Sequence, residues 1–163
     1  MADWQSVRVP ASSANLGPGF DTLALALGVY LDCRFRRSDR LGIRIAGRDA
    51  GLIPADRTNL IWRTIEDTAR AAGTEAPPLE LDIRNEIPIG KGLGSSAAAL
   101  VAGLAIADCA LGLGWTRDRV LDEAARLEGH PDNAAACVLG SVAVSAIDCS
   151  GRTWAIRLEM PDG

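Results

Sequence analysis

The chain has 163 residues, of which 48% are hydrophobic and 23% are charged, and its formal net charge is −4 at pH 7. This length and composition are typical of one globular domain with a sizeable core, and they exclude a disordered chain. Because there is no basic excess, nucleic acid is not expected as the main partner.

Predicted strands and helices alternate along the chain. Strands are predicted over residues 5–9, 27–36 and 41–46, and the last two are expected to pair through a turn at Ser38–Asp39. A helix over residues 58–72 follows, with Ile61, Ile65 and Ala69 on one face. The later pattern predicts a strand from Leu79, helices over 95–113 and 117–127, a short helix from Pro131, and strands over 141–147 and 154–158. This order indicates an α+β or α/β fold with helices on one face of a sheet.

A glycine-rich segment, Pro88-Ile-Gly-Lys-Gly-Leu-Gly-Ser-Ser-Ala97, precedes the longest predicted helix. Glycines let the backbone approach an anion, and a helix N-terminus offers free N–H groups to a phosphate. A side chain at Gly94 is then expected to obstruct the phosphate and to leave the fold intact. The segment is neither a Walker loop nor a dinucleotide fingerprint, since Ser95 stands where the third glycine of the fingerprint would be. Taken alone, it is equally well explained as a simple turn before a helix.

Two other segments combine polar and rigid residues. The first is Pro10-Ala-Ser-Ser-Ala-Asn-Leu-Gly-Pro-Gly-Phe-Asp-Thr22, and the second is Glu128-Gly-His-Pro-Asp-Asn133. Each has a plain structural explanation. Asn15 and Asp21 could form an Asx-turn, Glu128 could be an exposed helix carboxylate, and His130, the only histidine, could be a structural hydrogen bonder.

The cysteines and the longest apolar run indicate in which cellular compartment the protein is expected. Cys33, Cys109, Cys137 and Cys149 have no C-x-x-C spacing and lie among apolar residues, so buried free thiols are predicted. The apolar run of residues 94–113 contains Asp108 and is interpreted as a buried helix, not a membrane span. Because the start at Met1 is polar, no signal peptide is expected, and the chain is predicted to be cytoplasmic with no membrane partner.

The three segments together, in this order, resemble the GHMP kinases, and within them the branch that phosphorylates L-homoserine. The resemblance runs from about Val7 to about Val144. It implies a two-layer α/β sandwich of the α+β class, like the second domain of ribosomal protein S5. The glycine-rich motif of the family's C-terminal domain has no counterpart after Gly140. Residues 1–163 are therefore interpreted as the ATP-binding N-terminal domain of a longer kinase.

The resemblance also implies cofactors and roles for individual residues. ATP would lie on Pro88, Ile89, Gly90, Lys91, Gly92, Leu93, Gly94, Ser95, Ser96, Ala97 and Ala98, and Mg²⁺ on Ser95, Ser96 and Glu128. Asn15, Asp21, His130 and Asp132 would bind the amino-acid substrate, with Asp21 suited to its ammonium group. Asp132, Ser96 and Glu128 would take part in catalysis.

The implied reaction converts ATP and L-homoserine into ADP and O-phospho-L-homoserine, a step toward threonine. Two alternatives stay open: another small-molecule kinase of the family, or a nucleotide-binding fragment without catalysis. Whether a catalytic base is used and whether the chain forms a homodimer also stay open.

Overall fold

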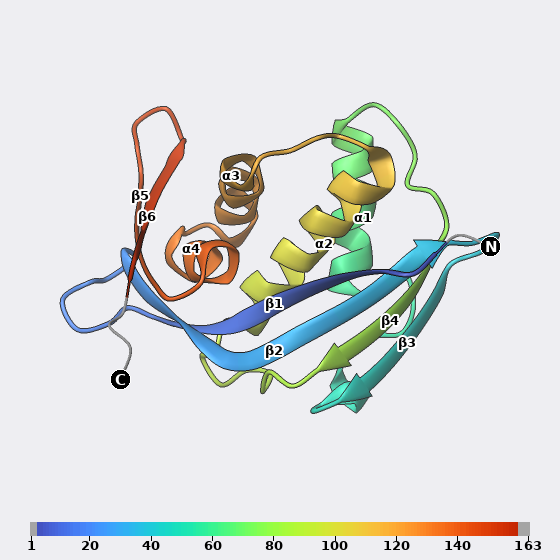
Figure 1. Ribbon diagram of the computed structural model, residues 1–163, viewed down its shortest axis with the longest axis horizontal. Helices are drawn as coiled ribbons and strands as arrows, with labels where there is room; N and C mark the ends of the chain where they lie inside the picture. The colour runs from blue at the N-terminus through green and yellow to red at the C-terminus, as the bar shows by residue number, and fades with distance from the viewer. Residues whose placement is uncertain (1–2, 160–163) are drawn as a thin grey trace.

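The computed structural model describes residues 3–159, which form one six-stranded sheet with helices packed on one of its faces (Figure 1). The polar start at Met1 and the end of the chain at Gly163, on which two sequence interpretations depend, lie outside the described residues. This is the mixed α+β architecture that the sequence predicts.

The elements occur in the predicted order. The strands are β1 (Gln5–Ala14), β2 (Leu23–Arg37), β3 (Gly42–Gly47), β4 (Leu79–Asn85), β5 (Val142–Ile147) and β6 (Thr153–Leu158). The helices are α1 (Leu60–Ala71), α2 (Ser95–Leu111), α3 (Arg117–Glu128) and α4 (Asp132–Leu139), with a 3-10 turn, η1 (Ala50–Leu52), before α1. The first two strands are longer than predicted, so β1 runs through the start of the first motif.

The pairing expected for β3 is wrong. β3 pairs in parallel with β4, from Gly42 beside Glu80 to Gly47 beside Asn85, and not with β2. β4 instead occupies this edge of β2, antiparallel from Leu31 to Arg37, while β1 pairs along the other edge. The physical reason is the crossover connection through α1: after it, β4 runs in the same direction as β3 and pairs with it in parallel.

Alternation along the strands separates an apolar face from a charged face. Val9, Leu31, Cys33, Phe35, Leu81 and Ile83 are buried beneath the helices. The intervening residues form ion pairs on the open face, including Arg8 with Asp32 at 2.6 Å and Arg44 with Asp82 at 3.2 Å. One covered and one solvated face give the predicted two-layer arrangement.

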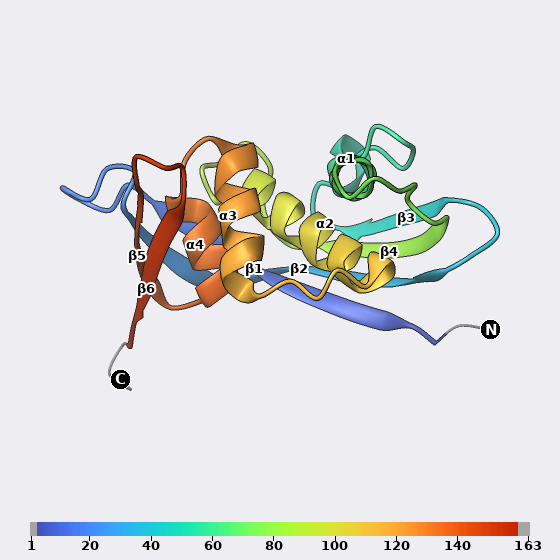
Figure 2. The same ribbon diagram turned by 90° about the horizontal axis from the view of Figure 1, so that it is seen from above.

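α2 and α4 pack over β1 and β2, and α3 packs against both of these helices (Figure 2). Asn59 caps α1 by accepting a hydrogen bond from the Ile61 N–H at 3.0 Å, and Ile61, Ile65 and Ala69 are buried as predicted. Gly103 lets α1 and α2 approach, because a Cβ there would lie 2.6 Å from Cβ of Thr64. Contact on both sides explains why α2 is apolar nearly all round.

Among the described residues, no helix is both long and apolar enough to cross a membrane. The run at residues 94–113, in particular, forms a largely buried helix of 17 residues. This agrees with the interpretation of that run as a core element.

The prediction for the cysteines is half right. All four are free, and Cys33 and Cys137 are buried, but Cys109 and Cys149 are exposed. Cys109 faces outward from the last turns of α2, where its thiol donates to Oε1 of Gln5 at 3.0 Å, and Cys149 lies in the turn between β5 and β6. Burial raises the pKa of the Cys33 and Cys137 thiols to about 12, so both stay protonated at neutral pH.

Candidate active site

The three sequence motifs meet at the N-terminal end of α2. The Ser12 N–H, on β1, donates to the Leu93 carbonyl of the glycine loop at 3.1 Å. The Ser12 hydroxyl donates to Oδ1 of Asn133, at the start of α4, at 2.8 Å. Segments up to 121 residues apart in sequence are thereby joined through one buried serine.

The glycines of the loop serve two different purposes. Gly90, Gly92 and Gly94 have φ angles of 69°, 69° and 63°, which are left-handed conformations that favour glycine. A Cβ at Gly90 or Gly92 would meet no atom within 4 Å. A Cβ at Gly94, in contrast, would lie 2.0 Å from Oγ of Ser12. The expectation that a side chain at Gly94 would obstruct only a ligand is therefore wrong, because the protein itself occupies that space.

The first turn of α2 has the properties of an anion site. Its N-cap is Gly94, which has no side-chain oxygen, and the first intrahelical bond runs from the Ala98 N–H to the Gly94 carbonyl at 2.9 Å. The N–H groups of Ser95, Ser96 and Ala97 consequently have no intrahelical acceptor. No acidic residue lies in this turn, so α2 itself supplies no carboxylate that would offset the positive end of its dipole.

Two of the three predicted metal ligands are in contact. The hydroxyl of Ser96, at the start of α2, donates to Oε2 of Glu128, at the end of α3, at 3.1 Å. No side-chain hydrogen bond joins the half-buried Ser95 to this pair within residues 3–159, and no cluster of three acidic, histidine or cysteine side chains occurs there. The pair fits Mg²⁺, which commonly takes one or two protein oxygens and completes its shell with phosphates and water.

His130 and Asp132 form a pair in which Asp132 is buried and His130 is partly exposed. Nδ1 of His130 lies 2.8 Å from Oδ1 of Asp132, and the His130 side chain is 38% exposed whereas that of Asp132 is 0% exposed. This contact engages Nδ1 of His130, and within residues 3–159 no hydrogen bond is made by its Nε2. Oδ1 also accepts the Asn133 N–H at 2.6 Å, while the buried Oδ2 has no partner among the described residues. His130, and not Asp132, is therefore the member of the pair that reaches the surface.

Asn15 and Asp21 also form a pair, in the connection between β1 and β2. Both have left-handed backbones, with φ of 58° and 51°, and the Asp21 N–H donates to Oδ1 of Asn15 at 2.8 Å. The bond joins residues six positions apart and so closes a longer loop than the short Asx-turn considered from the sequence. Both side chains are exposed, and in the described part of the chain no side-chain hydrogen bond or ion pair connects them to His130 or to the glycine loop.

Ser12 and Asn133 are the central residues that the sequence interpretation missed. Both lie inside motifs that were singled out, but β1 was predicted to end at residue 9, so no face could be assigned to Ser12. Val9 and Ala11 are buried at alternate positions, so a regular strand would turn Ser12 to the open face. Ser12 is buried as well, just after the point between Pro10 and Ala11 where the β1–β2 register shifts. This bulge turns Ser12 inward, and single-sequence periodicity does not reveal it.

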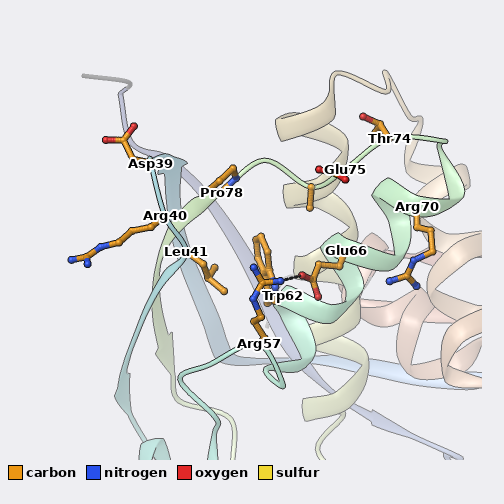
Figure 3. Close-up of a pocket in the computed structure, with 11 residues that line it drawn as sticks. Asp39, Arg40, Leu41, Arg57, Trp62, Glu66, Arg70, Thr74, Glu75 and Pro78 are labelled. Carbon is orange, nitrogen blue, oxygen red and sulfur yellow. Dashed lines mark hydrogen bonds and ion pairs between the residues drawn. The ribbon is translucent and has the colours of Figure 1, made fainter.

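A large cavity lies far from these motifs. It measures about 940 Å³ and is bordered by the β2–β3 turn, α1 and the α1–β4 connection (Figure 3). Charged residues such as Arg40, Arg57, Glu66 and Glu75 border it, and none of its lining residues belongs to the three motifs. The cavity adjoins the start of β4, whereas the glycine loop follows the end of that strand.

Comparison with known proteins identifies the family of the chain. Residues 59–141 match the family described as GHMP kinases N terminal domain. A homoserine kinase from Solibacter usitatus is 64% identical over 158 residues, covering 97% of this chain and 52% of that relative. A homoserine kinase from Deinococcus radiodurans is 43% identical, covering 96% of this chain and 50% of that protein.

Solved structures give the same result for the fold. A Listeria monocytogenes protein has a TM-score of 0.85 and 38% identity, over 98% of this chain and 55% of that one. Homoserine kinase from Cytophaga hutchinsonii has a TM-score of 0.78 and 30% identity, over 99% of this chain and 53% of that one. The chain spans about half the length of the curated relatives it matches.

Proposed function

The chain belongs to the GHMP kinase family, and from this premise we propose that it forms the ATP-binding part of a kinase that phosphorylates the hydroxyl of L-homoserine. The observation that carries the proposal is the Ser96–Glu128 pair, 3.1 Å apart beside the uncapped start of α2. Free N–H groups, a hydroxyl and a carboxylate meet there, as phosphoryl transfer requires. The choice of homoserine draws on the names of relatives that are 64% and 43% identical to this chain.

In this proposal each motif has one task. The glycine loop and the N–H groups of the first turn of α2 hold the nucleotide phosphates. Ser96 and Glu128 hold Mg²⁺, which when bound neutralises charge on the phosphates. Ser95, which makes no side-chain hydrogen bond to Glu128 within residues 3–159, contributes to the phosphates or to the outer metal shell.

The substrate is held by the other two motifs. Asp21 faces the ammonium group, and Asn15 fixes the loop that carries Asp21. Nε2 of the partly exposed His130 contacts the amino acid. The buried Asp132 acts indirectly, by holding the ring of His130 in place. With its carboxylate fully buried, Asp132 is better suited to orient His130 than to accept the hydroxyl proton directly.

A nucleotide-binding fragment without catalysis is the second candidate, because the chain spans about half the length of its relatives. Titration with MgATP and a coupled assay for ADP release, with homoserine, mevalonate and a hexose as acceptors, separate the candidates. We expect MgATP binding by this chain and homoserine-dependent ADP release by a protein of the relatives' full length. Preference for mevalonate or the sugar would contradict the homoserine assignment, and absence of nucleotide binding would overturn both candidates.

Replacing Glu128 by glutamine should raise the magnesium requirement. The amide can still accept the Ser96 hydroxyl, so the local structure is retained, but the charge that attracts the cation is lost. We expect the Mg²⁺ concentration for half-maximal activity to rise roughly tenfold or more, corresponding to about 1.4 kcal/mol or more. Glu123→Gln on the same helix is the matched control, since Glu123 pairs with Arg119 and Arg126 instead. An equal magnesium dependence in both variants would show that Glu128 is an ordinary helix carboxylate.

A further inference from the structure

The start of the glycine loop is held by the last residue of β3 and the two residues that follow it. This segment, residues 47–49, runs beside the end of β4, just before the loop begins. The closest approach is at Gly47, where a Cβ would lie 2.2 Å from the carbonyl oxygen of Asn85. The two backbones are therefore in direct contact, and no ordinary side chain fits between them.

Asn85 joins the two segments with its whole amide group. Its Nδ2 donates to the carbonyls of Arg48 and Ile87, each at 2.9 Å, and its Oδ1 accepts the Ile87 N–H at 3.2 Å. The Arg48 N–H in turn donates to the Asn85 carbonyl at 2.6 Å. Asn85 is 3% exposed and Ile87 is fully buried, so the Ile87 backbone groups would be left buried and unpaired without the Asn85 amide. The start of the loop is thereby fixed to the end of β3.

Asp49 extends this attachment into the loop itself. Its Oδ2 accepts the Ile89 N–H at 3.0 Å, although the two residues are 40 positions apart in the sequence. Asp49 is exposed and has a left-handed backbone with φ of 53°, so its position depends on the local turn and not on core packing. None of the three motifs includes this residue.

The same contact has an electrostatic consequence for an anion. The Ile89 N–H is already occupied, so it is not available to a phosphate, and the adjacent carboxylate repels negative charge. The free N–H groups of Ser95, Ser96 and Ala97 lie at the other end of the loop, at the positive end of the α2 dipole. Asp49 thus disfavours phosphate at the start of the loop. At the α2 end the Glu128 carboxylate beside Ser96 is, in the proposed function, paired with Mg²⁺, so it does not oppose the phosphates there.

We propose that Asp49 is a positioning residue of the nucleotide site: it fixes Ile89 at the start of the glycine loop and confines the phosphates to the α2 end. Asn85 supports it from within the sheet. The proposal rests on the proposed function, because the bound anion is taken to be the phosphate chain of a nucleotide.

Two substitutions separate the hydrogen bond from the charge. Asp49→Asn keeps an oxygen acceptor and removes the charge, whereas Asp49→Gly removes both. Asparagine and glycine both tolerate a left-handed backbone, so neither variant adds strain. We expect the affinity for MgATP, measured by calorimetric titration of this chain, to fall roughly tenfold in Asp49→Gly, since the freed loop must be ordered on binding. Asp49→Asn should bind at least as tightly as the parent chain.

A second readout does not depend on the nucleotide. Amide hydrogen exchange at Ile89 should become faster in Asp49→Gly and stay slow in Asp49→Asn, while the midpoint of thermal unfolding remains similar in all three proteins. Equal MgATP affinity in the parent and Asp49→Gly, or tighter binding in both variants, would overturn the positioning role. No MgATP binding by the parent chain would overturn the proposed function, and unchanged exchange at Ile89 would then overturn the attachment as well.

Discussion

Gly94→Ala is expected to lower the free energy of unfolding by about 3 kcal/mol or more and to abolish measurable MgATP binding. A left-handed alanine alone costs about 1–2 kcal/mol. The added Cβ would also lie 2.0 Å from Oγ of Ser12, so the serine must move and give up its 2.8 Å bond to Asn133. Loss of that buried bond adds about 1–3 kcal/mol. The three motifs would then separate at their common contact.

Gly92→Ala is the matched control for this experiment. Its φ of 69° is close to the 63° of Gly94, but its Cβ would meet no atom within 4 Å. Denaturant unfolding of both variants should therefore differ by the cost of displacing Ser12. Adding Ser12→Ala to Gly94→Ala removes the hydroxyl in the way, and it should recover part of the loss. If Gly92→Ala and Gly94→Ala lower the free energy of unfolding by the same amount, the close packing of Gly94 against β1 does not contribute to stability.

The expected outcome at Gly94 shows where the sequence was informative and where it was not. The motif residues and the helices could be predicted, because the glycine spacing is local and the apolar residues of α1 recur at helical period. The sequence also placed Ser96 and Glu128 together, through the family resemblance, and they lie in contact. The neighbour of Gly94 could not be predicted, because Ser12 depends on a register shift between Pro10 and Ala11.

The remaining differences have the same origin in long-range contacts. Ser38 and Asp39 suggest a hairpin, but the sequence does not reveal that β4 already occupies the edge of β2 that β3 would need. Asp49 shows no periodicity and belongs to no motif, and its role appears only when Ile89 is folded beside it. Local patterns predict elements, whereas partners that are 40 or more residues apart are decided by topology.

Asp21→Asn is expected to lower kcat/KM for homoserine by roughly two orders of magnitude or more in the full-length protein. Homoserine differs from mevalonate and from sugars in its ammonium group, which a carboxylate in a partly desolvated site would pair with. Asparagine accepts the left-handed φ of 51°, and the backbone bond from residue 21 to Oδ1 of Asn15 is unaffected. The loop should therefore keep its shape and lose only its charge.

The test varies each substrate in turn in steady-state kinetics, with Asp39→Asn as a control. Asp39 is an exposed carboxylate at the cavity that adjoins the start of β4, away from the three motifs, so its substitution should leave both substrates unaffected. In Asp21→Asn the KM for ATP should change little, because Ser12, Asn85 and Asp49 hold the glycine loop. Among residues 3–159 no hydrogen bond joins this loop to residues 15–21. Equal losses for both substrates would indicate a disturbed first motif instead of a lost ion pair. An unchanged kcat/KM for homoserine would mean that Asp21 does not bind the ammonium group. The main structural reason for assigning homoserine, and not another alcohol, as the substrate would then be lost.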